Sequence, residues 1–187
     1  MITDRDMKIL KFISDVRICT NDDIQKVFFE GLNVNVCYRR LTHLVECKYI
    51  KRSYFNIDGR KNAYIYYLDK KPSKKILKHD LLITKFLTML YEDYEIISFE
   101  KTPMVAGIIP DAIIKFKVND KIKHIFLEVQ LQPYSIIEKY YNIKSKVNDC
   151  PNTLYIITNQ EIKNTKLRDL KVVIDDLEMS KLKFYYS

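Results

Sequence analysis

The stretch from residue 33 to residue 68 constrains the fold of this chain most, because a helix pattern there runs directly into two strand patterns. Within residues 35–48 the apolar side chains recur at helical spacing and form one stripe, made by Cys37, Leu41, Leu44 and Val45. Two runs of β-branched and aromatic residues follow, at residues 49–55 and 62–68, with an Asp-Gly pair between them. This pattern predicts a helix followed by a β-hairpin.

Two shorter helices are predicted before this stretch. Thr3 and Thr20 are suitable N-caps, because each hydroxyl can accept a backbone hydrogen bond and acidic residues follow within one turn. The first helix is expected to end near Asp15, and Gly31 is expected to stop the second. Three helices and a hairpin joined by short loops predict a winged helix-turn-helix domain over residues 1–70.

The outward face of the helix in residues 35–48 carries hydrogen-bond donors and planar groups instead of the usual mixture of Glu and Lys. Such a face suits the major groove of DNA, where base edges present donors and acceptors. The side chains on this face that are expected to reach base edges are Asn35, Tyr38, Arg39 and Thr42, and His43 lies on the same face as a further DNA-binding candidate. For His43, simple exposure to water is an equally good explanation. The side chains expected to contact phosphates are Arg40, Arg60 and Lys61, the last two at the tip of the hairpin.

The distribution of charge supports double-stranded DNA as the partner. The chain has a net charge of +8, and residues 33–75 hold 11 Lys and Arg against 3 Asp and Glu, which accounts for the whole excess. A localised excess of this kind is expected where a protein contacts phosphates, although Lys-rich amino-acid usage can also produce it. Binding of this type requires no cofactor.

Composition argues for a compact protein outside the membrane. Of the residues, 47% are hydrophobic and 30% are charged, which is enough to build a core and is unlike a disordered chain. No apolar run is long enough to cross a bilayer, and the first residues lack the apolar segment of a signal peptide. We therefore expect a cytoplasmic protein without a membrane partner. The four cysteines form no CxxC pair, so neither a zinc site nor a disulfide framework is indicated, and buried free thiols are expected.

A second domain is predicted over residues 76–187. A polar, basic segment interrupted by Pro72 indicates a boundary near Lys75. The patterns that follow are a helix over residues 79–91, strands at 94–99, 112–118 and 122–131, a helix over 135–147, a strand at 154–158, a further helix and a strand at 171–174. The whole chain is thus expected to be of the α+β or α/β class.

Two acidic residues lie at unusual positions in these strands. Asp111 follows a proline at the start of one strand, and Glu128 lies among apolar residues in the next. Carboxylates on adjacent strands can hold one divalent cation, so Mg²⁺ is the cofactor that Asp111 and Glu128 would bind. The alternative is structural: Asp111 caps a turn, and Glu128 pairs with a Lys or with Arg168.

This arrangement resembles the PD-(D/E)xK nuclease core, in which an Asp and a Glu hold magnesium and a Lys two positions further on activates the attacking water. Here that position is Gln130, which supplies no positive charge, and the nearest basic candidate is Lys139. The residues of an active site of this kind would be Asp111, Glu128, Gln130 and Lys139. The missing Lys favours a restriction-endonuclease-like αβββαβ domain that does not cut DNA.

The two halves together resemble the replication-relaxation family of plasmid and phage proteins. The resemblance rests on the motifs YRRLTHLVECKYIKR, IPDAII, FLEVQ and EKYYNI, with His79 at the head of a helix, and it spans nearly the whole chain. It implies a role in the replication, transfer or transcription control of a mobile element. A replication or relaxosome protein and a second copy of the chain are the further partners it would allow.

Three functions are open at this point. The residues favour a sequence-specific double-stranded DNA-binding protein. The second is a metal-dependent DNA nuclease that the winged helix guides to its site. The third is an interaction module, whose nuclease-like domain recruits a partner or forms a homodimer.

Overall fold

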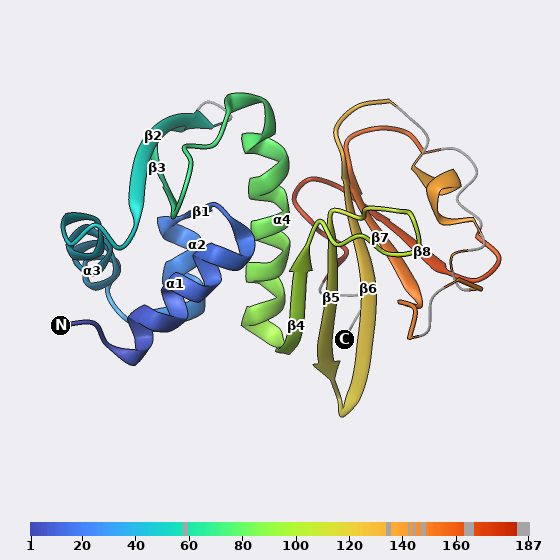
Figure 1. The fold of residues 1–187 in the computed structure, drawn as a ribbon, viewed down its shortest axis with the longest axis horizontal. Coiled ribbons are helices and arrows are strands. Elements are labelled where there is room, and N and C mark those ends of the chain that lie inside the picture. Colours follow the sequence, from blue (N-terminus) through green and yellow to red (C-terminus); the bar gives the residue numbers. More distant parts are fainter. Residues whose placement is uncertain are drawn as a thin grey trace. The chain divides into compact units, whose positions relative to one another are not determined.

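The structure is a computed structural model that describes residues 1–57, 60–133, 136–141, 143, 145–146, 149–162 and 167–182, without the side chains of residues 57 and 60–63. The chain is a mixed α+β protein, and it divides into two compact units, residues 1–92 and residues 93–187 (Figure 1). Within the described ranges, no helix combines the length and the apolar character that a membrane span needs.

The first unit begins with three helices: α1 (Asp4–Val16), α2 (Asn21–Phe28) and α3 (Val34–Glu46). The two predicted threonine caps are confirmed, because each hydroxyl accepts a hydrogen bond from the backbone N–H three residues further on. The buried stripe of α3 is confirmed at three of its four predicted positions, since Cys37, Leu41 and Leu44 are fully buried, and Val45 is half-buried. The phase of α3 therefore turns the other side of the helix outward, as the sequence pattern requires.

A three-stranded antiparallel sheet completes the predicted hairpin region. Its strands are β1 (Cys19–Thr20), β2 (Lys51–Ile57) and β3 (Arg60–Tyr67), in the order β1-β3-β2. The predicted hairpin is confirmed as the pairing of β2 with β3, in which Tyr54 lies opposite Tyr64. Its Asp-Gly turn lies outside the described residues.

The fourth helix, α4 (Lys74–Asp93), corrects the predicted domain boundary. The sequence placed the division near Lys75, whereas the compact units divide after Glu92. The reason is tertiary: Thr84 Oγ1 donates a hydrogen bond to the carbonyl oxygen of Ile18 at 2.8 Å, and Glu92 pairs with Lys26 at 2.8 Å. Leu77 joins the same core cluster as Ile18. The polar segment before α4 is thus a loop inside the first unit.

Replacing Thr84 by Val is expected to destabilise the first unit by about 1–2 kcal/mol, because the buried carbonyl of Ile18 would lose its donor while the shape of the side chain is kept. Native-state hydrogen exchange measures this by region. Faster exchange is expected in residues 4–67, with no change in the strands of the second unit. Thr84→Ser keeps the hydroxyl and is the control. Faster exchange confined to residues 95–175 would place α4 with the second unit instead.

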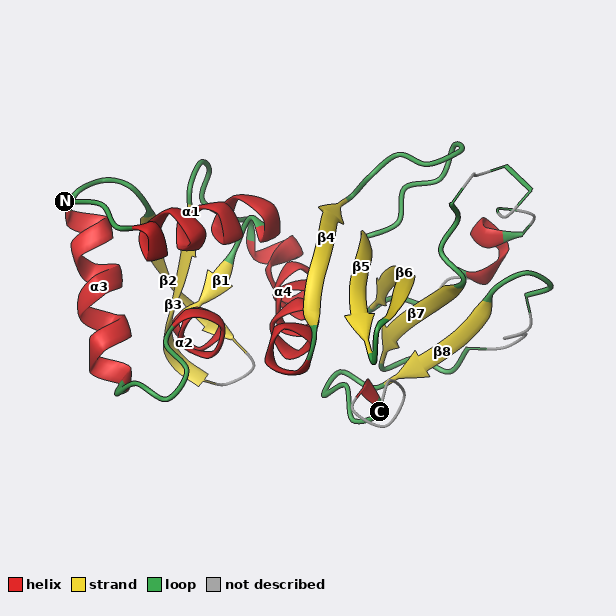
Figure 2. Cartoon of the chain, turned by 90° about the horizontal axis from the view of Figure 1, so that it is seen from below, coloured by secondary structure: helices red, strands yellow, loops and turns green. Residues whose placement is uncertain are grey.

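The second unit is built on a five-stranded sheet in the order β4-β5-β6-β7-β8 (Figure 2). Its strands are β4 (Glu95–Lys101), β5 (Ala112–Val118), β6 (Lys121–Gln130), β7 (Thr153–Thr158) and β8 (Lys171–Asp175). The strands β4, β5 and β6 pair in antiparallel fashion, and β6, β7 and β8 are parallel. All five predicted strands are confirmed.

The helix predicted at residues 79–91 is confirmed as α4, but the helices predicted at residues 135–147 and between the last two strands are not observed in the residues that the structure describes. In the part of residues 135–147 that the structure describes, the helical element is a single 3-10 turn, Ile137–Tyr140. The apolar side chains that gave the helical pattern, Ile136, Ile137, Tyr140 and Ile143, pack into a core cluster with Phe126. Apolar residues that pack into a core can therefore have helical spacing in the sequence without forming a long helix. The described residues between β7 and β8 contain no helix either, and α4 belongs to the first unit, so the predicted αβββαβ order is not observed.

Candidate nucleic-acid interface

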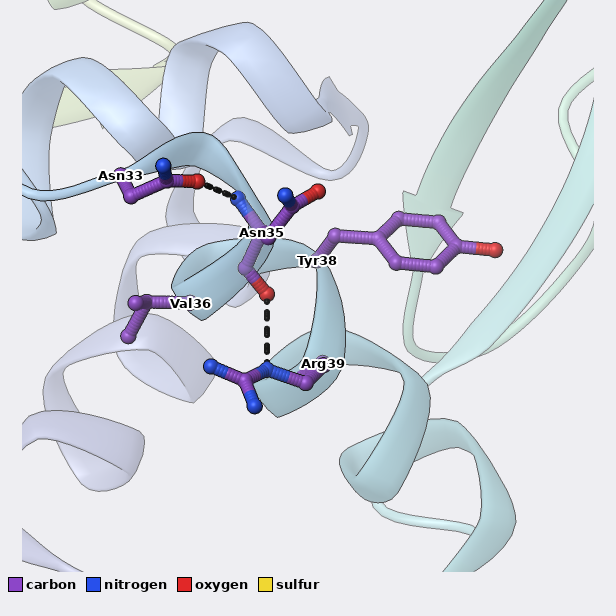
Figure 3. A pocket seen from close by; sticks show the side chains of 5 residues that line it. All are labelled: Asn33, Asn35, Val36, Tyr38 and Arg39. Carbon is purple, nitrogen blue, oxygen red and sulfur yellow. Dashed lines mark hydrogen bonds between the residues drawn. The ribbon is translucent and has the colours of Figure 1, made fainter.

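An open pocket of about 590 Å³ lies at the start of α3. The residues that line it are Asn33, Asn35, Val36, Tyr38 and Arg39 (Figure 3). Asn33 caps the helix, since its Oδ1 accepts a hydrogen bond from the N–H of Asn35 at 2.9 Å, and Arg39 Nε donates to the carbonyl oxygen of Asn35 at 3.3 Å. Three of the four predicted base-contacting residues, Asn35, Tyr38 and Arg39, therefore come together on one exposed surface.

The chemistry of this pocket suits the edges of nucleobases. The amide of Asn35 offers a donor and an acceptor, and the guanidinium of Arg39 offers several donors in a fixed plane. Both side chains are exposed, and both stand on the first turns of a helix. The phenol ring of Tyr38 extends away from Asn33 and Val36 (Figure 3). Asn33 was not predicted as a site residue, although an Asn directly before a helical pattern is a common capping signal.

Thr42 and His43 lie on α3 but not in the pocket. Thr42 Oγ1 accepts a hydrogen bond from Arg52 Nη1 of β2 at 3.4 Å, so this hydroxyl links the helix to the hairpin. His43 Nε2 lies 3.7 Å from the Sγ of Cys47, one turn further along the chain. All four cysteines are free thiols. Cys19 and Cys37 are buried as expected, whereas Cys47 is exposed and Cys150 is half-buried.

Arg40 has a structural role that differs from the predicted phosphate contact. Its Nε donates to Asp6 Oδ1 at 2.7 Å, and its Nη2 donates to Asp6 Oδ2 and to the carbonyl oxygen of Met1. The Asp6 carboxylate is fully buried and also accepts a hydrogen bond from the N–H of Thr3 at 2.6 Å. The Arg40 guanidinium holds the pKa of Asp6 well below its usual range. Arg40 thus ties α3 to the N-terminal cap of α1.

The predicted phosphate contacts at the tip of the hairpin are Arg60 and Lys61. Their side chains lie outside the described part of the structure, so their role stays a prediction. The backbone of both residues belongs to β3. This places them next to the turn of the hairpin, as the sequence pattern requires.

A second group of predicted residues converges in the second unit. Lys139 Nζ donates to Glu128 Oε1 and to the carbonyl oxygen of Ile109, both at 2.5 Å, and the hydroxyl of Tyr140 donates to the same Glu128 oxygen. Asp111 Oδ2 accepts a hydrogen bond from the N–H of Val129 at 2.8 Å. The structural alternative, in which Glu128 pairs with a Lys, is therefore observed. The part played by Tyr140 was missed, because its position in sequence indicated only core packing.

Electrostatics explain why Glu128 needs these partners. Glu128 is 2% exposed, and this burial, together with the nearby charge of Asp111, raises the pKa of Glu128 to about 7. The ammonium of Lys139 and the hydroxyl of Tyr140 act in the opposite direction by stabilising the carboxylate. Gln130 is also buried, but its Nε2 donates to the carbonyl oxygen of Gln132 at 3.2 Å and adds no charge.

These residues do not fit a resident Mg²⁺ in the observed arrangement. Among the residues with described positions, no group of three His, Cys, Asp or Glu side chains could hold a metal ion. The two carboxylates of the predicted pair are already bound by an ammonium, a phenol hydroxyl and a backbone N–H. The Lys139 ammonium and the Tyr140 hydroxyl both bind Oε1 of Glu128, so a hard cation at that oxygen would compete with the ammonium.

The residues of the α3 pocket lie close together in sequence on one helix, whereas Asp111, Glu128 and Lys139 are brought together by contacts between distant segments. The resemblance to the replication-relaxation family depends on short motifs, and it stays a prediction. Comparisons of this chain with protein-family models, with curated proteins and with solved structures find no match.

Proposed function

We propose that this chain is a sequence-specific double-stranded DNA-binding protein whose first unit is a winged helix-turn-helix. The element order of that unit, from α1 to β3, is the order that such a domain requires. The observation that carries the proposal is the exposed group of Asn33, Asn35, Tyr38 and Arg39 at the start of α3. The net charge of +8 within residues 33–75 supports it, because a DNA partner is a polyanion.

In the proposed complex, α3 lies in the major groove with its first turns toward the bases. Arg39 would donate to a guanine and Asn35 would bind an adenine, since these pairings match the donors and acceptors of the two bases. Arg60 and Lys61 would contact phosphates from the hairpin. Arg40 is not part of this set, because its guanidinium is bound to Asp6.

The resemblance described above narrows the biological role to replication, transfer or transcription control of a plasmid or phage. A protein that reads a two-fold symmetric site usually binds it as a dimer. A second copy of the chain is therefore expected on the DNA if the selected site has two-fold symmetry.

Arg39→Ala is expected to weaken binding to the cognate duplex by about 1–3 kcal/mol and to relax base preference at one position. Lys61→Ala is expected to weaken binding to all sequences alike and to lower the slope of log affinity against log salt by about one. The cognate duplex is first selected from a random pool, and both variants are then titrated on matched and scrambled duplexes over a range of salt. Two variants that bind like the parent protein would contradict the proposal.

A metal-dependent DNA nuclease is the second candidate function. The observation that favours it is the position of Lys139, whose ammonium lies against Glu128 although Lys is missing two positions after that residue. The same contact weighs against it, because the Lys139 ammonium and the Tyr140 hydroxyl already bind one oxygen of the Glu128 carboxylate. DNA binding without cleavage is therefore the primary proposal.

A further inference from the structure

The two faces of the β2–β3 hairpin differ in a way that the proposed base contacts of α3 do not explain. Side chains alternate between the faces of a strand, so Phe55, Ile65 and Tyr67 share one face, and they pack in the core cluster with Ile18 and Leu77. The opposite face carries Arg52, Tyr54, Tyr64 and Tyr66. We call this second set the tyrosine face.

The tyrosine face contains three planar groups in contact, and the rings of Tyr54 and Tyr64 are tilted by 37° to each other. The ring centroids of Tyr54 and Tyr64 are 3.9 Å apart, and the two hydroxyls are hydrogen bonded to each other. The guanidinium carbon of Arg52 lies 4.6 Å from the centroid of Tyr64. These contacts fix the rings before any ligand arrives, which lowers the entropy cost of binding on them.

Exposure increases along this face. Tyr66 is fully buried and Tyr64 is half-buried, whereas Tyr54 is 55% exposed. A large aromatic ring so exposed, already fixed by a neighbour, offers an unused surface to solvent. The hairpin therefore presents a rigid aromatic platform, and not only side chains that pack the sheet.

We propose that Tyr54 stacks an unpaired nucleobase of a single strand on the tyrosine face. Unpaired bases expose their ring faces, whereas bases within a duplex are covered by their neighbours, so only the former can stack on a fixed ring. Residues 33–75 carry a net charge of +8, which favours a polyanion such as a nucleic acid over a protein surface with few acidic residues. The inference rests on the proposed function for its source of ligand, which is a strand opened next to the duplex site that α3 reads.

The test compares labelled oligothymidylate, the same strand with abasic positions, and the selected duplex, each titrated by fluorescence anisotropy. Tyr54→Ala is expected to bind oligothymidylate about 10- to 100-fold more weakly than the parent protein. Tyr54→Phe keeps the ring and is expected to bind like the parent. The parent is expected to bind the abasic strand as weakly as Tyr54→Ala binds the intact one. Tyr49→Ala is the matched control, since Tyr49 is 48% exposed but lies outside the tyrosine face.

Several outcomes would overturn the inference. The parent protein could bind oligothymidylate no better than the abasic strand, or Tyr54→Ala could bind it like the parent. If Tyr54→Ala binds weakly and its thermal unfolding curve is also altered, Tyr54→Phe must retain binding for the inference to stand. Sequence-selective duplex binding that Arg39→Ala weakens, without any effect of Tyr54, would leave the proposed function standing alone. Binding of the single strand that depends on Tyr54, without selective duplex binding, would leave only this inference.

Discussion

Replacing Arg40 by Leu is expected to lower the free energy of unfolding of the first unit by about 3 kcal/mol, because the carboxylate of Asp6 would stay buried without its partner. Removal of one member of a buried ion pair leaves an uncompensated charge, and this is costlier than the loss of an exposed pair. The side chain of Arg40 is 27% exposed, so water relieves part of the penalty and the lower end of the range for such pairs applies.

The matched control is Arg39→Leu, one residue earlier on the exposed face of α3. Urea unfolding followed by circular dichroism should show a lower midpoint for Arg40→Leu and an almost unchanged one for Arg39→Leu. The double variant Asp6→Asn with Arg40→Leu should lose less than the sum of the two single variants, because neither charge then remains alone. If Arg40→Leu is as stable as the parent protein but binds DNA weakly, Arg40 contacts phosphates, and its proposed structural role is wrong.

The same pair predicts how stability depends on pH. The pKa of Asp6 is held far below its ordinary value of 3.8, so the carboxylate is charged in the folded protein under conditions that would protonate it in the unfolded chain. Its stabilising contribution is complete above about pH 5 and is lost as the pH falls below 3.8 toward the depressed pKa. Asp6→Asn should therefore flatten the acid side of a plot of unfolding free energy against pH. A parallel loss in parent and variant would contradict this assignment.

Local pattern was sufficient for much of the first unit. The spacing of Cys37, Leu41 and Leu44 gave the phase of α3, and with it the exposure of Asn35 and Arg39. Capping chemistry gave the starts of α1 and α2, since a threonine and an acid three residues later satisfy each other within one turn. Such interactions span a few residues and are visible in a sequence.

Contacts between distant segments were not visible. Arg40 and Asp6 are 34 residues apart, and no local pattern indicates that Arg40 pairs with a buried acid instead of a phosphate. The assignment of α4 to the first unit depends on a hydrogen bond from Thr84 to Ile18, across 66 residues. A basic loop with a proline looks the same whether it joins two domains or lies within one.

The site in the second unit combines features that could be predicted from the sequence with a contact that could not. The strands that bring Asp111 near Glu128 could be predicted, because alternating apolar patterns marked them clearly. The approach of Lys139 depends on an irregular segment with one 3-10 turn, where the sequence predicted a longer helix. Only the structure shows that its ammonium reaches Glu128, and this contact changes what the pair of acids can do.

Lys139→Ala is expected to destabilise the second unit by about 3 kcal/mol at pH 8, because the buried carboxylate of Glu128 would lose its cation. The pKa of Glu128 is about 7 even with Lys139 present, so the carboxyl can take up a proton when the pH falls. The loss should therefore be smaller at pH 6 than at pH 8. The double variant Glu128→Gln with Lys139→Ala has no carboxylate at residue 128, so its stability should not show this dependence on pH.

The same variants decide whether the acids act as a metal site. The parent protein is expected not to cut supercoiled or linear DNA that carries its selected site, with Mg²⁺ or with Mn²⁺, because the Lys139 ammonium already neutralises Glu128. Mg²⁺ is expected to leave the melting temperature of the parent unchanged and to raise that of Lys139→Ala, in which Glu128 no longer has the ammonium beside it. Metal-dependent cleavage by the parent that is absent from Asp111→Ala and from Glu128→Ala would overturn the primary proposal. Lys139 would then be the displaced basic residue of a nuclease, since its ammonium is the positive charge observed at these acids.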